Sequence, residues 1–138
     1  MFTPKKVKHR KWWKGRHRTE IESRGTELSF GTYGLQVSEG EARITSRQLE
    51  SARRVISRTM KRGGKMWIRI FPDRPITQKG VEVPMGGGKG SVDHFVALVM
   101  PGRIIFEIDG VTEDVAKDAL TLASHKLPVR TRVIIREE

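Results

Sequence analysis

The sequence predicts an α+β fold in which an antiparallel sheet carries two helices. Two segments place apolar residues at helical spacing, and each follows a threonine suited to an N-cap. Five other segments are rich in β-branched and aromatic residues, as strands are. They are residues 28–37, 65–71 and 129–136, and two strands within 91–109 that are joined at Pro101-Gly102. The length, 138 residues, fits one domain, 1–138, with a single core.

The first predicted helix begins after Thr45, which forms a capping-box pattern with Gln48, and ends at Gly63-Gly64. Its apolar residues form one stripe for the core: Leu49, Ala52, Ile56 and Met60. The opposite side is basic and carries Glu50 as its acid. The outward cations are Arg47, Arg54, Arg58, Lys61 and Arg62, with Arg53 nearer the boundary.

A basic amphipathic helix of this kind can lie on an anionic membrane or bind phosphates. Helices that lie on membranes use bulky Trp, Phe and Leu side chains on their apolar face. The stripe of this helix lacks that set. The sequence therefore favours phosphate binding.

The second predicted helix is capped by Thr112, with Glu113 and Asp114 at its positive end. Its predicted buried face consists of Val115, Ala116, Ala119, Leu120, Leu122, Ala123 and Leu127, before Pro128 ends it. The side chains of the final predicted strand alternate between the two faces of the sheet. Its inward residues are predicted to be Val129, Thr131, Val133 and Ile135, and its outward ones Arg130, Arg132 and Arg136.

Charge is distributed unevenly along the chain. The net charge is +11. After residue 100 there are six Lys and Arg residues against seven Asp and Glu, so residues 1–100 carry +12. A surface charged only for solubility needs much less than this. The asymmetry predicts a side that faces a polyanion, of which nucleic acid is the commonest.

The most basic segment is an arm, 1–18, that contains no acid. Its cations are Lys5, Lys6, Lys8, Arg10, Lys11, Lys14, Arg16 and Arg18, and they are interrupted by Trp12 and Trp13. Aromatic rings among cations suit stacking on bases or sugars beside neutralised phosphates. Alternatively, one of the two tryptophans pins the arm to the protein's own core.

Residues 72–91 lack periodicity and are predicted to form an extended loop. Prolines at 72, 75 and 84 stiffen it, and four glycines free its tip, "MGGGKGS". A Walker A loop is excluded, because Val83 stands at the position of its first glycine and Gly90 at that of its hydroxyl residue. The tip is then a flexible turn or a backbone that approaches RNA closely, and the basic charge of the chain favours RNA.

Several function classes are excluded by what the chain lacks. Without cysteine it has no disulfide framework and no thiol nucleophile. Its longest apolar run, 95–100, falls far short of the roughly 20 residues that span a bilayer. The polar start is unlike a secretory signal, and the histidines show no metal-ligand spacing. We expect a cytoplasmic protein that is not an enzyme and has no cofactor, metal, membrane or small-molecule substrate.

Six stretches occur in the order typical of one family: "PKKVKHRKWWKGR", "LSFGTYGLQ", "ITSRQLESARRVISRTMKRGGKMWIRIFPDRPIT", "MGGGKG", "VALVMPGRIIFEIDGV" and "ASHKLPVRTRV". Over nearly its whole length the chain resembles bacterial-type ribosomal protein L-sixteen of the large subunit, in the L-sixteen/L-ten-e family. The most specific signatures are Ile68 to Thr77 and His125 to Pro128. The resemblance implies an α+β fold of the hammerhead type.

The resemblance also implies partners in the cytoplasmic ribosome: large-subunit (23S-type) rRNA, tRNA and neighbouring ribosomal proteins. It assigns rRNA contact, near the central protuberance and the peptidyl transferase region, to the arm from Lys5 to Arg18 and to the outward helix cations. The loop tip is implied to reach toward the acceptor ends of tRNA. Its residues are Met85, Gly86, Gly87, Gly88, Lys89 and Gly90.

This chain departs from the family at the loop tip. Many relatives have an arginine just before the loop's methionine and a lysine between its first glycines, where this chain has Pro84 and Gly87. The tip thus lacks two positive charges. The alternative interpretation of the whole chain is a free-standing RNA-binding protein or RNA chaperone, which would not be stoichiometric with large subunits.

Overall fold

The computed structural model describes residues 3–4, 22, 24–61, 63–78 and 91–136. The elements in chain order are β1 (Tyr33–Glu39), β2 (Ala42–Thr45), α1 (Ser46–Thr59), β3 (Lys65–Ile68), β4 (Arg74–Gln78), β5 (Ser91–Val99), β6 (Ile104–Asp109), α2 (Glu113–Ser124) and β7 (Arg130–Ile135). Neighbouring strands pair antiparallel throughout these residues. The predicted α+β class with two helices is confirmed.

The strands form two sheets, whereas the sequence predicts one. The first has the order β3-β6-β1-β7 and the second β2-β5-β4. The predicted tight turn between β5 and β6 is present, with Gly102 at a φ of +99° and Arg103 N donating to Met100 O at 3.1 Å. This turn is bound to β1 through the N–H and C=O groups of Val37, so β6 leaves β5 and enters the other sheet.

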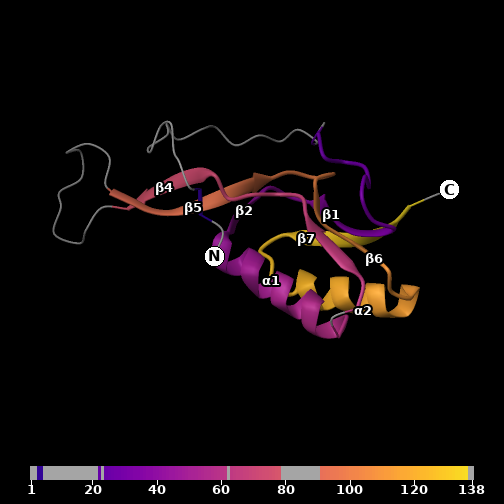
Figure 1. Ribbon diagram of the computed structural model, residues 1–138. Coiled ribbons are helices and arrows are strands. Elements are labelled where there is room, and N and C mark those ends of the chain that lie inside the picture. Colours follow the sequence, from indigo (N-terminus) through magenta and orange to yellow (C-terminus); the bar gives the residue numbers. More distant parts are fainter. Residues whose placement is uncertain (1–2, 5–21, 23, 62, 79–90, 137–138) are drawn as a thin grey trace.

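Part of the segment predicted as a loop is a strand. Residues 74–78 form β4 and pair with β5, and β5 also pairs with β2, which the sequence does not indicate. Pro75 fits in β4 because this is an edge strand, where a missing N–H leaves no neighbouring carbonyl unpaired. β4 and β5 extend past the helices (Figure 1). The rest of the predicted loop, 79–90, lies outside the described residues.

The helices begin as predicted. Gln48 N donates to Thr45 Oγ1 at 3.2 Å and Thr45 N to Gln48 Oε1 at 2.9 Å, which completes the capping box of α1. Thr112 caps α2 through Val115 N. Both helices lie on one side of the strands (Figure 1), where their apolar faces share a core with the first sheet. The sheet residues in this core include Leu35, Val37, Phe106 and Ile108.

Two predicted core residues are exposed: Leu122 by 46 % and Ile135 by 44 %. The fully buried residues of α2 are the small Ala116, Ala119 and Ala123 together with Leu120. Small side chains let α2 pack close to α1, so the buried stripe is narrower than predicted and excludes Leu122. Ile135 ends β7, which is an edge strand of its sheet and has a neighbouring strand on one side only.

A substitution at Gly64, between α1 and β3, tests how strictly the backbone conformation at this junction requires glycine. It has a φ of +71°, and a β-carbon there would overlap the carbonyl oxygen of Asp109. We expect Gly64→Ala to lower the free energy of unfolding by about 2–3 kcal/mol, because left-handed strain and a backbone clash act together. Gly40→Ala is the matched control, since Gly40 has a φ of +82° but nothing within 4 Å. It should cost about 1 kcal/mol.

Denaturant unfolding of both variants measures the difference. Equal losses of stability would mean that the chain relieves the clash at Gly64 by a small local shift.

Candidate nucleic-acid interface

The outer face of α1 is basic, as the helical spacing predicts. Leu49, Ala52 and Ile56 are buried on the inner face. The predicted cations Arg47, Arg54, Arg58 and Lys61 are all exposed. Their exposure leaves the charges available to a partner in solution. Arg62, the last cation of the predicted set, lies outside the described residues.

Glu50 is the acid within this basic face, and it is held by two arginines. It accepts hydrogen bonds from Arg53, three residues on, and from Arg54 Nε at 3.2 Å, four residues on. The hydrogen bond from Arg53 is the main cause that lowers the pKa of the Glu50 carboxyl to about 2. Glu50 therefore stays ionised at neutral pH and orients two guanidinium groups, while its single charge leaves the face strongly positive.

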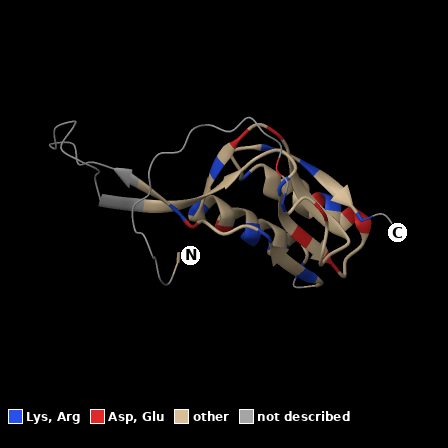
Figure 2. Cartoon of the chain, turned by 90° about the horizontal axis from the view of Figure 1, so that it is seen from above, with Lys and Arg blue, Asp and Glu red and all other residues tan. Residues whose placement is uncertain are grey.

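The exposed face of α2 has the opposite character. Glu113, Asp114 and Asp118 are exposed there together with Lys117. Lys117 Nζ lies 2.9 Å from a Glu113 carboxylate oxygen, and this hydrogen bond raises the pKa of the lysine. Elsewhere in the described part of the chain, both basic and acidic residues occur along the ribbon (Figure 2). The basic face of α1 is thus a local concentration of positive charge.

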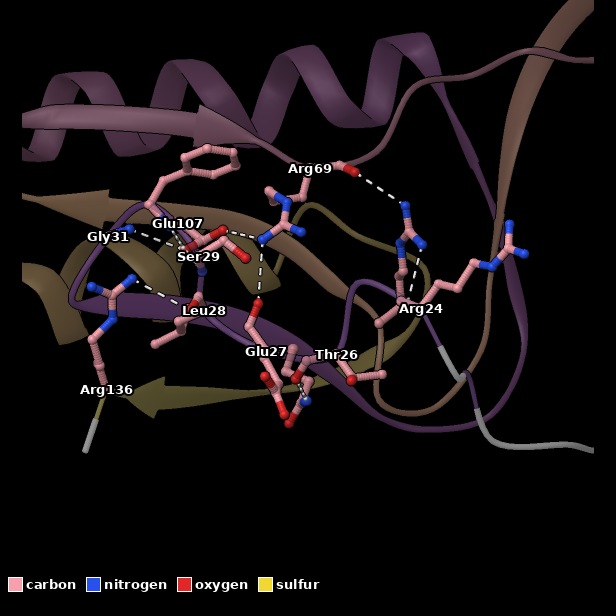
Figure 3. Close-up of polar contacts among 12 residues, drawn as sticks. Arg24, Thr26, Glu27, Leu28, Ser29, Gly31, Arg69, Glu107 and Arg136 are labelled. Carbon is pink, nitrogen blue, oxygen red and sulfur yellow. Dashed lines mark hydrogen bonds and ion pairs between the residues drawn. The ribbon is translucent and has the colours of Figure 1, made fainter. Parts of the chain in front are cut away.

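The segment 24–31, which precedes β1, is bound to the first sheet by side chains from four places in the chain (Figure 3). Each of these side chains donates to a main-chain carbonyl: Arg103 to Arg24 at 3.2 Å, Gln36 to Thr26 at 3.1 Å, Arg69 to Glu27 at 3.3 Å and Arg136 to Leu28 at 3.3 Å. Ile104 N also donates to Gly25 O at 2.8 Å. We call this arrangement the polar clamp. It fixes the backbone that follows the basic arm.

Glu107 on β6 completes the polar clamp. Its side chain is fully buried, and Oε1 accepts the N–H groups of Ser29 and Phe30 at 2.9 Å and of Gly31 at 3.0 Å. Oε2 pairs with Arg69. Burial raises the pKa of this carboxyl, but the three N–H donors and the guanidinium outweigh burial, so its pKa is lowered. These bonds explain why β1 begins at Tyr33 and not at residue 28 as predicted.

An aromatic pair lies over the ion pair of the polar clamp. The rings of Phe30 and Trp67 stack with their centroids 6.0 Å apart, and the Arg69 guanidinium carbon lies 5.2 Å from the Phe30 centroid. One signal of this arrangement is visible in the sequence, an acid inside the apolar run of β6. Such an acid needs buried partners, but they come from residues 29–31 and 69, which no local pattern connects to it.

The other predicted site residues belong to the arm and the loop tip. Both segments, from Lys5 to Arg18 and from Met85 to Gly90, lie outside the described residues. Within the described part of the chain, no helix is long and apolar enough to cross a membrane. The same residues hold no group of three or more His, Asp or Glu side chains placed to bind a metal ion.

The fold and the charged surface define a basic α+β protein in which one helix, α1, has a basic outer face. Its sequence matches the family described as "Ribosomal protein L16p/L10e" over residues 4–134. The chain therefore belongs to this family. The family predicted from the sequence motifs is confirmed, and the chain is a ribosomal protein of the cytoplasm and not an enzyme.

Curated relatives agree over almost the full length. The chain is 58 % identical over 136 residues to "Large ribosomal subunit protein uL16" of Bartonella bacilliformis, covering 99 % of this chain and 98 % of that protein. It is 59 % identical over 137 residues to the protein of the same name from Caulobacter vibrioides, covering 99 % of this chain and 94 % of that protein.

Glu107→Gln tests the polar clamp. The amide keeps the shape of the carboxyl but loses its charge, so Arg69 and three N–H donors face a weaker acceptor. We expect the free energy of unfolding at pH 7 to fall by about 3 kcal/mol. Glu39→Gln is the matched control, because the pair of Glu39 with Arg130 is exposed. It should cost less than about 0.5 kcal/mol.

The pH dependence follows from the lowered pKa of Glu107. Its contribution to stability is complete above the unfolded pKa of 4.5 and is lost as the pH falls through the lower folded pKa. Urea unfolding between pH 7 and pH 3 should therefore show a steeper loss of stability in the wild type than in Glu107→Gln. Parallel curves would mean that Glu107 has the same pKa in the folded and the unfolded protein, so that the polar clamp does not stabilise its ionised form.

Proposed function

We propose that this protein is a structural constituent of the large ribosomal subunit, that it binds large-subunit rRNA, and that it helps to position tRNA near the peptidyl transferase centre. The large-subunit role is supported by the names of the relatives from Bartonella and Caulobacter. The observation that carries rRNA binding is the basic outer face of α1, where Arg47, Arg58 and Lys61 are exposed.

The geometry of α1 suits a phosphate backbone. Its inner face is occupied by the core, so the helix cannot turn its cations inward. Exposed arginines offer several N–H donors each and pair with phosphate in bidentate fashion. Each phosphate that they neutralise releases condensed counterions, which makes the binding favourable and dependent on salt.

The arm is the second proposed contact with rRNA, through its cations and its two tryptophans. The polar clamp supports this, because it holds the backbone from Arg24 onward, six residues after the arm ends in the sequence. An arm with a fixed root loses less freedom on binding than one on a mobile segment. Together the arm and α1 give the protein two regions for rRNA.

The proposed role in tRNA placement belongs to the loop tip, Met85 to Gly90. Support comes from β4 and β5, which extend past the helices (Figure 1) and which flank residues 79–90 in the sequence. Glycine allows a backbone to approach RNA closely. Because Pro84 and Gly87 replace charged residues of many relatives, contact through the backbone is the proposed mode.

We also propose that residues 1–138 form one domain of the hammerhead type and contact neighbouring ribosomal proteins.

Charge reversal on α1 tests the rRNA interface. The double variant Arg54→Glu, Arg58→Glu should bind 23S-type rRNA more weakly, with unchanged folding, because both side chains are exposed. The slope of log affinity against log salt should fall by roughly 0.7–0.9 for each phosphate that is no longer neutralised. Filter binding across a salt series measures both quantities.

The matched control reverses two exposed lysines on or just after α2, Lys117→Glu and Lys126→Glu, with the same change in net charge. This control should keep the wild-type slope, since its effect is only long-range and screened. If both double variants lose affinity equally, net charge alone drives binding and α1 is not the interface.

A sedimentation experiment distinguishes a ribosomal constituent from a free RNA-binding protein. A ribosomal constituent should sediment with large subunits, at one copy for each subunit.

The loop tip is tested by Gly88→Val in assembled subunits. The branched side chain intrudes where the backbone would approach RNA, so tRNA binding and peptide-bond formation should fall while assembly is unchanged. Lys89→Ala should have a smaller effect that disappears at high salt, as expected of one exposed phosphate contact. Normal activity of Gly88→Val subunits in both assays would mean that the tip serves only as a flexible turn.

A further inference from the structure

A cleft of about 580 Å³ lies where the connection from β3 to β4 passes the end of β5. Its volume falls within the range of about 300–1,000 Å³ that is usual for small-ligand sites. Apolar groups from Ile70 and Leu98 line part of it, and Arg69, Phe71, Asp73 and Arg103 add polar and aromatic groups. Its lining residues among those that the structure describes do not belong to α1. The proposed function therefore gives these residues no role.

The groups of this cleft are of three chemical kinds. Phe71 is 48 % exposed and presents an aromatic ring. Asp73 is exposed and presents a carboxylate. Arg103 presents a guanidinium that donates to the carbonyl oxygens of Arg24 and Arg69. A guanidinium has five N–H donors, and because these two acceptors are uncharged, the bonds to them do not neutralise its positive charge.

Arg69 differs from Arg103 in this respect. Its charge is compensated by Glu107, so it serves to hold the wall of the cleft. Arg24, whose carbonyl oxygen binds Arg103, is exposed and adds positive charge beside the cleft. The carboxylate of Asp73 and the guanidinium of Arg103 therefore give the cleft one acceptor group and one cationic donor group.

We propose that this cleft binds one unstacked nucleotide of rRNA, with its base on Phe71 and its phosphate at Arg103. A nucleotide carries a planar ring, N–H donors and an anionic phosphate in one unit, which matches the ring, the carboxylate and the guanidinium. Recognition of RNA commonly uses bases turned out of single-stranded regions and stacked on aromatic side chains. Guanine fits the carboxylate of Asp73 best, because its N1–H and N2–H donors lie on one edge.

The proposal rests on the proposed function, since the nucleotide must belong to rRNA beside the bound protein. It adds a third contact region, which lies between the two sheets and uses a base as well as the backbone. A side chain of a neighbouring ribosomal protein is the competing occupant. Such a side chain would stack on the Phe71 ring or pair with one of the two charges, but it would not match all three groups together.

Chemical probing of rRNA in assembled large subunits tests this site. Dimethyl sulfate reports whether the pairing edges of adenine and cytosine are covered, and kethoxal does the same for guanine. In Phe71→Leu subunits we expect one rRNA nucleotide to become more reactive, because loss of stacking lowers the equilibrium constant for docking by about tenfold. The same nucleotide should respond in Asp73→Asn subunits. Both side chains are exposed, so thermal unfolding should be unchanged.

Phe30→Leu is the matched control. Phe30 is an aromatic residue with a similar exposure, 54 %, but it stacks on Trp67 outside the cleft. Its subunits should show the wild-type reactivity at the nucleotide in question. A response in this control equal to that of Phe71→Leu would assign the effect to general loosening of the fold and overturn the proposal.

The remaining outcomes separate the two proposals. If the wild-type protein does not sediment with large subunits, the proposed function itself fails. If it does sediment, but no nucleotide differs between wild type and Phe71→Leu, the cleft does not hold a base. A chemical crosslink from the cleft to another ribosomal protein would assign the site to that protein and likewise overturn the proposal.

Discussion

The buried carboxylate of Glu107 joins three parts of the chain that are far apart in the sequence. Removing an ionised group from water costs several kcal/mol. Here three main-chain N–H groups from residues 29–31 and the Arg69 guanidinium offset that cost. Because these partners satisfy the charge only in one arrangement, Glu107 sets where β1 begins and how the connection after β3 leaves the sheet. The polar clamp and the wall of the cleft both depend on it.

The two faces of the first sheet are covered in different ways, and this determines where charge is left for a partner. One face packs against the apolar stripes of α1 and α2. The other carries segment 24–31, held by the polar clamp. The outer surfaces of the two helices are exposed. Their charges are opposite in sign, since α1 is basic and α2 is acidic. A polyanion repels the acidic surface, so the pair of helices favours one orientation of the protein on any polyanion that it binds.

Local signals in the sequence predict the helices, whereas non-local pairing decides much of the rest. The capping box of Thr45 and Gln48 and the stripe from Leu49 to Met60 are set by neighbours within four residues, so they could be found. The division into two sheets depends on hydrogen bonds between the Gly102 turn and Val37, which no periodicity reveals. The basic face of α1 followed from spacing alone. The cleft did not, because Phe71, Leu98 and Arg103 meet only through the topology.

The proposed rRNA contact and the proposed tRNA contact are mechanically connected. Thr45 is both the last residue of β2 and the N-cap of α1. β2 pairs with β5, and β5 pairs with β4, so the strands that lead toward the loop tip are hydrogen-bonded to the strand that enters the helix. A helix fixed on rRNA through its outer cations would therefore fix the direction of β4 and β5 as well. On the proposed function, the basic face of α1 would contribute to tRNA placement without touching tRNA, because it would set the direction in which the two strands extend.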